Sequence, residues 1–153
     1  LTGDPKSKMS SFINVIDNLV TTLQNDSALI SFCNTKWGKT LKALPLYKNR
    51  VEINLEELPI ILITRPQNKK EFIVGGRAYE HTVRLYCGFN QSDRAKALAE
   101  IIEFDETIEA ALLADRNRGG YAIDTDPQST VNDEGPVHTS YFLAMDVTIL
   151  TET

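Results

Sequence analysis

Residues 78–89 read AYEHTVRLYCGF and carry a clear two-residue alternation. One side of this stretch carries the mostly apolar set Tyr79, His81, Val83, Leu85, Cys87 and Phe89. The intervening positions hold Ala78, Glu80, Thr82, Arg84 and Tyr86. Because successive side chains of a strand point to opposite faces, the alternation predicts a long strand. We expect one of its faces in the core and the other against water or a partner.

A second strand is expected just before it. Residues 58–64, LPIILIT, are rich in Ile and Leu and lead into Arg65-Pro66, where a residue before proline avoids helical angles. Pro59 fits only the first residues of a strand or an edge. After a polar turn at 66–70, residues 72–74 are expected to pair back as a hairpin arm. Gly75-Gly76 then allows a bulge or tight turn.

Helical spacing appears in three places. From Ser10, a possible N-cap, to Asn25 the apolar stripe is Phe12, Ile16, Leu19 and Leu23, widened by Ile13 and Val20. A short helix capped by Asp26 or Ser27 is expected to reach Cys33, followed by an irregular stretch over 36–57. The longest helix should run from Ser92 or Asp93 toward Gly119-Gly120, and we expect Asp105 to split it in two.

The C-terminal part combines a polar run with a strand. Residues 121–124 look strand-like, whereas residues 126–136, DPQSTVNDEGP, predict an exposed loop. From His138 or Thr139 to about Leu150 the alternation returns, with Tyr141, Leu143, Met145, Val147 and Ile149 on one face. This element order predicts one α+β domain over residues 1–153, with residues 1–9 flexible. Its antiparallel or mixed sheet should carry the N-terminal helix and the long central helix on one face.

Composition narrows the class of protein. The chain has 153 residues, of which 42% are hydrophobic and 24% charged, as in ordinary globular domains. No apolar run approaches the roughly 20 residues of a membrane span, so none is expected. The net charge of −5 argues against broad nucleic-acid binding. Cys33 and Cys87 are too few for a disulfide scaffold, which favours a reducing compartment.

Catalytic constellations are missing from the sequence. His81 and His138 share no metal-binding motif with each other or with a cysteine, and Gly38-Lys39-Thr40 lacks the first glycine of a phosphate-binding loop. Cys87 and His81 would lie about 20 Å apart in one strand, too far for a nucleophile and its base. We therefore expect no enzyme, no metal and no cofactor.

Charge is distributed unevenly. Arg65, Lys69, Lys70, Arg77 and Arg84 gather around the first hairpin, while Asp126, Asp133 and Glu134 occupy the polar run near the C-terminus. One interpretation docks the basic hairpin of one subunit against the acidic loop of another, and ordinary solvated charge is the alternative. Two further hypotheses stay open. One is a small ligand-binding or hydrolytic domain with its site near His81 and Tyr79. The other is a dimeric adaptor joined through an exposed strand edge, such as the final strand.

A family resemblance rests on four segments: LPIILI at 58–63 before a hairpin, RLYCGF at 84–89, the helix rich in Ala95, Ala97 and Ala99, and DEGP at 133–136 before the last strand. Over 10–150 the chain resembles the tail terminator and tail-completion (neck) proteins of long-tailed bacteriophages. The resemblance implies a structural virion protein without enzymatic activity. Such a protein is expected to form a hexameric ring that caps the tail tube and joins it to the head connector.

The same resemblance implies partners and a location. The partners would be further copies of the chain, the tail tube protein and the head–tail connector proteins, and DNA would pass through the ring without specific binding. The protein would sit at the tail or neck of the virion after assembly in the cytoplasm of the bacterial host. An acidic chain suits a DNA channel, because carboxylates repel phosphate.

Overall fold

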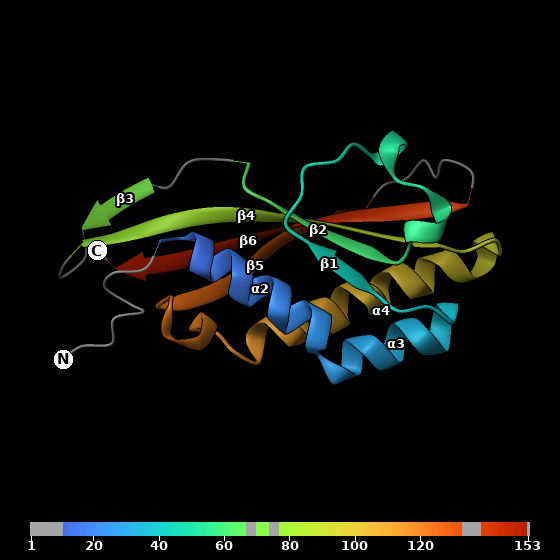
Figure 1. The fold of residues 1–153 in the computed structure, drawn as a ribbon, viewed down its shortest axis with the longest axis horizontal. Coiled ribbons are helices and arrows are strands. Elements are labelled where there is room, and N and C mark those ends of the chain that lie inside the picture. The colour runs from blue at the N-terminus through green and yellow to red at the C-terminus, as the bar shows by residue number, and fades with distance from the viewer. Residues whose placement is uncertain (1–10, 67–69, 74–76, 133–138, 153) are drawn as a thin grey trace.

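The computed structural model describes residues 11–66, 70–73, 77–132 and 139–152, with side chains left out at 50, 70–73, 77 and 129–132. They form an α+β fold, in which the mixed sheet has strand order β1-β2-β4-β6-β5 and β3 also pairs with β4 (Figure 1). The strands are β1 (Lys42–Leu44), β2 (Ile60–Thr64), β3 (Lys70–Ile73), β4 (Arg77–Asn90), β5 (Asp124–Asn132) and β6 (Ser140–Glu152). Pairing of β1 with β2 is parallel, and all other pairings are antiparallel. The expected fold class is confirmed.

Three helices of the described chain, α2 (Ile13–Asn25), α3 (Ser27–Trp37) and α4 (Arg94–Leu113), lie on one side of the sheet in Figure 1. Phe12 takes the N-cap position of α2, and the expected cap Ser10 lies outside the described residues. Asp26 caps α3 by accepting a hydrogen bond from the Leu29 N–H at 2.9 Å. In α2 the buried face is Val15, Leu19 and Leu23, whereas the side chain of Ile13 is 66% exposed.

The long helix α4 is continuous, so the expected break at Asp105 is wrong. Asp93 caps its start by accepting from the Ala95 N–H at 3.0 Å. Ile101, Phe104 and Ile108 follow at helical spacing on both sides of Asp105, and all three are buried. Their packing fixes the helix across the aspartate, because tertiary burial outweighs the weak propensity of one residue.

The two long central strands, β4 and β6, pair over their full length, from Ala78 with Glu152 to Asn90 with Ser140. Tyr79, at the start of the predicted inner face of β4, is only partly buried. The rest of the two predicted inner faces is confirmed: His81, Val83, Leu85, Cys87, Phe89, Tyr141, Leu143, Met145, Val147 and Ile149 are buried. Because β6 has β4 on one side and β5 on the other, its edges are occupied. A dimer joined through the edge of the final strand is therefore ruled out.

The first hairpin differs from the expectation in its pairing. β3 does not pair back on β2; both strands pair with β4, β2 through Ile60–Thr64 and β3 through Lys70–Ile73. The two therefore lie end to end along one side of β4. The expected turn at Gly75-Gly76 lies outside the described residues. A long β4 stabilises this arrangement because it offers a full row of backbone groups to two short strands.

The polar run contains a strand where a loop was expected. Residues 126–132 belong to β5, which pairs with β6 from Asp124 with Leu150 to Asn132 with Leu143. Pro127 fits because β5 is an edge strand, and the register shifts between Pro127 and Ser129 in a bulge. The remaining part of the predicted loop, 133–136, lies outside the described residues. Residues 121–124 are strand-like only at their end, because the 3₁₀ helix η3 (Arg118–Gly120) precedes them.

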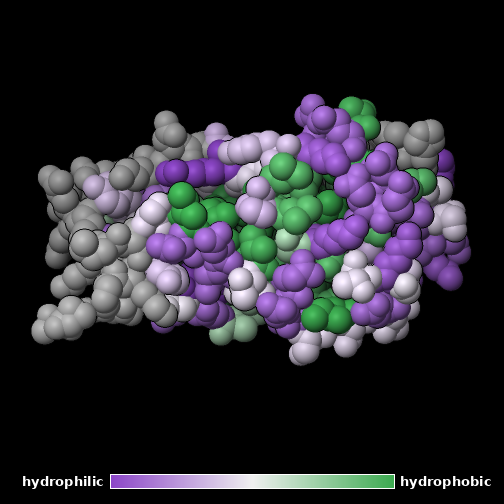
Figure 2. Space-filling model, in the orientation of Figure 1, coloured by the Kyte–Doolittle hydropathy of each residue, from purple (hydrophilic) through white to green (hydrophobic). Residues whose placement is uncertain are grey.

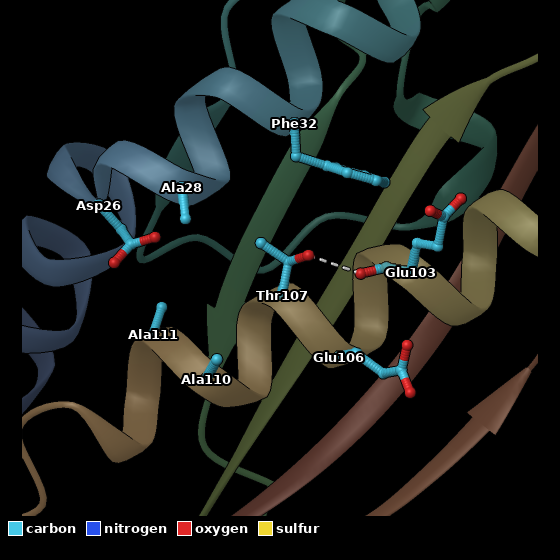
Figure 3. A pocket seen from close by; sticks show the side chains of 8 residues that line it. All are labelled: Asp26, Ala28, Phe32, Glu103, Glu106, Thr107, Ala110 and Ala111. Atoms are coloured by element: carbon cyan, nitrogen blue, oxygen red, sulfur yellow. Dashed lines mark hydrogen bonds between the residues drawn. The ribbon is translucent and has the colours of Figure 1, made fainter.

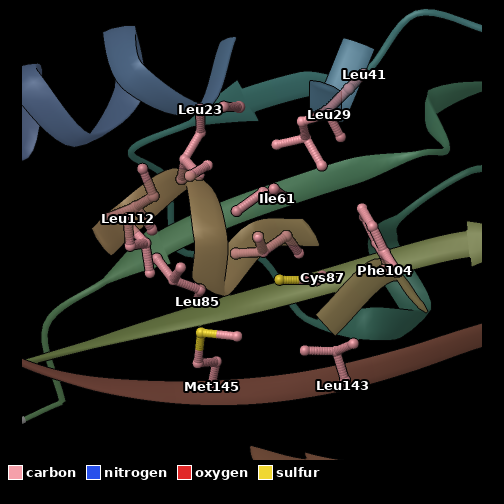
Figure 4. Close-up of a cluster of buried hydrophobic side chains, with 14 of the residues drawn as sticks. Leu23, Leu29, Leu41, Ile61, Leu85, Cys87, Phe104, Leu112, Leu143 and Met145 are labelled. Atoms are coloured by element: carbon pink, nitrogen blue, oxygen red, sulfur yellow. The ribbon is translucent and has the colours of Figure 1, made fainter. Parts of the chain in front are cut away.

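The core has two parts, one on each side of the sheet. The larger lies between the sheet and the helices and includes Leu23, Leu29, Ile61, Leu85 and Phe104 (Figure 4). The smaller, on the other side, consists of Leu58, Ile60, Leu62 and Phe142, with Ile53 packed against it. Residues 45–59, which include the 3₁₀ helices η1 (Arg50–Glu52) and η2 (Leu55–Glu57), supply this cover. The rest of that sheet face, centred on Tyr86, is more exposed.

Within the smaller core, Phe142 lies across Gly88, its partner in the β4–β6 register. A Cβ atom at position 88 would run into the Phe142 ring. The glycine is therefore required by close approach, since an aromatic ring fills the space that a side chain would take.

The first strand, β1, was not expected from the sequence. Gln24 of α2 completes its outer edge: the amide Nε2 donates to the Leu41 carbonyl at 2.7 Å, and Oε1 accepts from the Ala43 N–H at 2.8 Å. Pro45, just past the strand, has no N–H to offer. The edge is thus closed to another strand, as edges commonly are in monomeric domains.

Candidate interaction surface

Arg65, the first residue of the predicted basic cluster, is built into the packing of the N-terminal helix. Its guanidinium lies 5.1 Å from the centroid of the Phe12 ring. One terminal nitrogen lies 3.3 Å from Nδ1 of His81. The backbone of Arg65 is held by the hydroxyl of Tyr47, which accepts from its N–H at 3.3 Å and donates to its carbonyl at 3.2 Å. The contacts of the Arg65 side chain therefore stabilise the fold.

His81 is a packing residue as well. Its ring stacks on Phe12 with centroids 3.9 Å apart and planes inclined by 12°. Because Arg65 can only donate, Nδ1 accepts, and Nε2–H donates to Thr151 Oγ1 at 2.9 Å. Both ring nitrogens are engaged in a side chain that is 4% exposed. This arrangement argues against the alternative of a ligand or catalytic site centred on His81.

Arg84 lies on the other face of the sheet from Arg65. Its Nε and NH2 atoms donate to the two carboxylate oxygens of Asp146 at 2.7 and 3.1 Å, across the β4–β6 register. Hydrogen bonding to Asp146 raises the pKa of Arg84 above its usual value. The pair is about one-third exposed on the open face of the sheet. The structure therefore separates two residues that the sequence had placed in one cluster.

The other predicted interaction residues are placed as follows. Lys70 of β3 pairs with Glu80, and Arg77 at the start of β4 pairs with Ile73, so the two lie at opposite ends of the β3–β4 ladder. Asp126 lies in β5 with its side chain exposed. Lys69, Asp133 and Glu134 lie outside the described residues. The contact between the basic hairpin of one subunit and the acidic loop of another therefore stays a prediction.

Two arginines near the end of α4 were not singled out by sequence reasoning. Arg118 is fully buried; its NH2 donates to the Leu112 carbonyl at 2.7 Å, and its Nε donates to the Asp115 carbonyl at 2.8 Å. It thus caps the last carbonyls of the helix, and burial lowers its pKa. Arg116 pairs with Asp124 at 2.7 Å, and this hydrogen bond lowers the pKa of the Asp124 carboxyl. A basic residue just past a helix end, before Gly-Gly, was the available signal.

The buried groups that could carry chemistry are structural. Glu100 accepts from Trp37 Nε1 at 3.0 Å and from Gln91 Nε2 at 2.8 Å. Burial raises the pKa of the Cys33 thiol to about 12 and that of Cys87 well above its usual value. Both thiols are thus protonated at neutral pH and poor nucleophiles. Among the described residues, no three of His, Cys, Asp and Glu gather where they could hold a metal ion.

An open hollow of about 400 Å³ lies between α3 and α4 (Figure 3). Its lining includes Phe32, Thr107 and Ala110, and its acidic groups are Asp26, Glu103 and Glu106. The carboxylate of Asp26 caps α3. The Thr107 hydroxyl donates to the Glu103 carbonyl at 2.7 Å. We find no convergence of catalytic groups in this hollow.

The fold is similar to that of a chain in a solved virion. That structure is the virion of a native gene transfer agent particle; the two folds agree with a TM-score of 0.58 over 88% of this chain and 92% of the other, at 11% sequence identity. The likeness therefore covers nearly the whole of both chains and shows a shared fold. No protein-family model matches the chain, and no curated protein matches it.

None of the helices within the described part of the chain is both long enough and apolar enough to cross a membrane.

Proposed function

We propose that this chain is a structural subunit of a phage-like virion. The observation that carries the proposal is the fold shared with a chain of the gene transfer agent virion, which extends over 88% of this chain and 92% of that one. A likeness over nearly the full length of both chains points to the whole domain, not to one widespread motif. The resemblance to phage neck proteins supports the same conclusion; it rests on 58–63, 84–89, the helix rich in Ala95, Ala97 and Ala99, and 133–136 before the last strand.

The more specific proposal is a ring that caps the tail tube and joins the tail to the head connector. We expect a hexamer whose partners are the tail tube protein on one side and the connector proteins on the other. The net charge of −5 supports this role, since an acidic ring lets DNA slide through without gripping it. The protein would reside at the neck of the particle, after assembly in the host cytoplasm.

The buried chemistry supports a role without catalysis. Both cysteine thiols are protonated inside the core, and His81 has both ring nitrogens engaged by Arg65 and Thr151. Glu100 is bound by Trp37 and Gln91. Each of these side chains stabilises a contact between elements, as expected for a subunit whose surface, not its interior, does the work.

The test is to mix the purified protein with tail tubes assembled from the tube protein alone. Negative-stain electron microscopy should show a cap at one end of each tube, and tubes should stop growing when the protein is added. The control is the same mixture with a heat-unfolded sample. Bare tube ends and unchanged tube lengths at saturating protein would contradict the proposal.

A further inference from the structure

Two unlike surfaces lie at opposite ends of the strand order, one beside β1 and one beside β5. The first, here called the β1 flank, consists of Lys39, Lys42, Leu44, Leu46 and Tyr47. The second, here called the α4 flank, consists of Leu98, Ile102, Glu106 and Glu109. Because β1 and β5 are the two outermost strands, the flanks border opposite edges of the sheet.

The β1 flank is apolar at its centre and basic around it. Leu44, Leu46 and Tyr47 are 38%, 45% and 72% exposed, which is unusual for three large apolar residues so close in sequence. Lys39 and Lys42 beside them are exposed. The stretch 36–50 carries five basic residues and no acidic one. Two of the five are paired with carboxylates, Lys36 with Glu103 and Lys48 with Glu57, so the charge of the flank itself comes from Lys39 and Lys42. Figure 2 shows hydrophobic surface near the end of β1, bordered by hydrophilic side chains.

The α4 flank is apolar and acidic. Leu98 and Ile102 are 68% and 46% exposed, one helical turn apart, and Glu106 and Glu109 continue on the following turns, both exposed. Over its length, α4 contains five acidic and two basic residues.

Three of the four residues of the α4 flank face away from α3. Glu106 lies at the border, because it lines the hollow beside α3 together with Glu103, Thr107 and Ala110. Glu103 also pairs with Lys36 of α3 at 3.4 Å. At about 100° per residue, Leu98, Ile102 and Glu109 fall on the other flank of the helix, which borders β5. The exposed leucine and isoleucine therefore have no cover from α3.

We infer that copies of this chain associate head to tail, with the β1 flank of one copy seated on the α4 flank of the next. The inference rests on the proposed ring. The apolar centre and the lysines of the β1 flank meet the apolar centre and the glutamates of the α4 flank. The complementary charges fix which surfaces meet. Such a contact is heterologous, and a heterologous contact closes into a ring when its rotation allows.

Strand addition at β1 or β5 does not compete with this contact. Gln24 and Pro45 block the β1 edge, and Pro127 with the adjacent bulge interrupts the β5 edge. At these two edges, neighbouring copies would therefore join through side chains. A standard interface takes about 800 Å² from each partner. Two of them would occupy about a fifth of the 8391 Å² surface, which leaves room for other partners.

The experiment uses two charge-reversal variants, K39E/K42E and E106K/E109K. Each changes four units of charge, and D17K/E152K, which alters two exposed carboxylates outside both flanks, is the matched control. Circular dichroism and thermal melting establish that all variants fold. Assembly is measured by light scattering and by electron microscopy, with and without tail tubes.

Each flank variant alone should weaken assembly by at least about tenfold, because like charges then face each other, and D17K/E152K should assemble normally. A mixture of the two flank variants should recover assembly, since reversed lysines of one then face reversed glutamates of the other. A chain carrying all four substitutions should recover it as well. These recoveries occur only if the two flanks meet each other.

The outcomes separate this inference from the proposed function. If wild-type protein forms rings or caps and both flank variants do so equally well, the interface assignment is wrong while the ring stands. If the flank variants fail and the mixture stays inactive, these surfaces bind some other partner and the inference also fails. If wild-type protein neither self-associates nor caps tubes, the proposed function falls and the inference with it.

Discussion

Replacing Gln24 by methionine is expected to destabilise the fold by about 2–3 kcal/mol. The amide of Gln24 makes hydrogen bonds of 2.7 and 2.8 Å to the backbone of Leu41 and Ala43. Those two residues are 1% and 2% exposed, so water replaces the lost partner poorly. Methionine has a similar length and keeps the apolar contacts of the side chain, and it therefore isolates the loss of the two hydrogen bonds.

A loss of this size in the free energy of unfolding can be measured by thermal melting. For a domain of about 150 residues, 1 kcal/mol corresponds to about 2–4 °C in melting temperature, so the Gln24→Met variant should melt roughly 5–10 °C below wild type. Hydrogen exchange should accelerate at the Ala43 amide in particular. The matched control is Gln128→Met, on an exposed residue of β5. A melting temperature within about 1 °C of wild type, with Ala43 still protected, would refute the role of Gln24 in closing the β1 edge.

Three further predictions follow from single contacts. Gly88→Ala should cost about 1–3 kcal/mol in chemical denaturation because its Cβ meets the ring of Phe142, and Phe142→Leu in the same chain should recover part of the loss; unchanged stability would contradict this packing. The pKa of Asp124 is lowered by Arg116, so this carboxylate adds stability above the unfolded pKa, and the benefit disappears as pH falls through the folded pKa. When the pH is lowered below about 4, the Asp124→Asn variant should therefore lose less stability than wild type does. Parallel profiles of stability against pH for the two proteins would count against the Arg116–Asp124 pair. Burial raises the pKa of Cys33 to about 12 and that of Cys87 well above its usual value, so both thiols should react with a disulfide reagent at pH 8 only as fast as the protein unfolds; rapid labelling of folded protein would be inconsistent with their burial.

The long strands could be predicted because a two-residue period is a strong signal when one face is fully buried. Both β4 and β6 carry five or more alternating inner residues, and the structure buries all of those from His81 to Phe89 and from Tyr141 to Ile149. β1 escaped prediction because three residues show no period, and its edge depends on Gln24, which is distant in sequence. β5 was assigned as a loop because Pro127 and many polar residues disfavour a strand everywhere except at an edge.

The candidate site was harder to predict, because proximity along a hairpin does not specify a face of the sheet. Thr64 pairs with Arg84, so the next residue, Arg65, points to the opposite face. The register alone would have separated the two arginines, but it depends on which strands pair. Asp146, which lies far along the chain, then binds Arg84. Such a partner cannot be found from local sequence.

We propose that this chain is a structural component of the neck of a virion. Immunogold electron microscopy of purified particles, with an antibody raised against this chain, is the decisive experiment. We expect gold at the junction of head and tail on most particles and none on particles from a strain lacking the chain. Particles that carry no label, although the same antibody binds the purified protein, would contradict it.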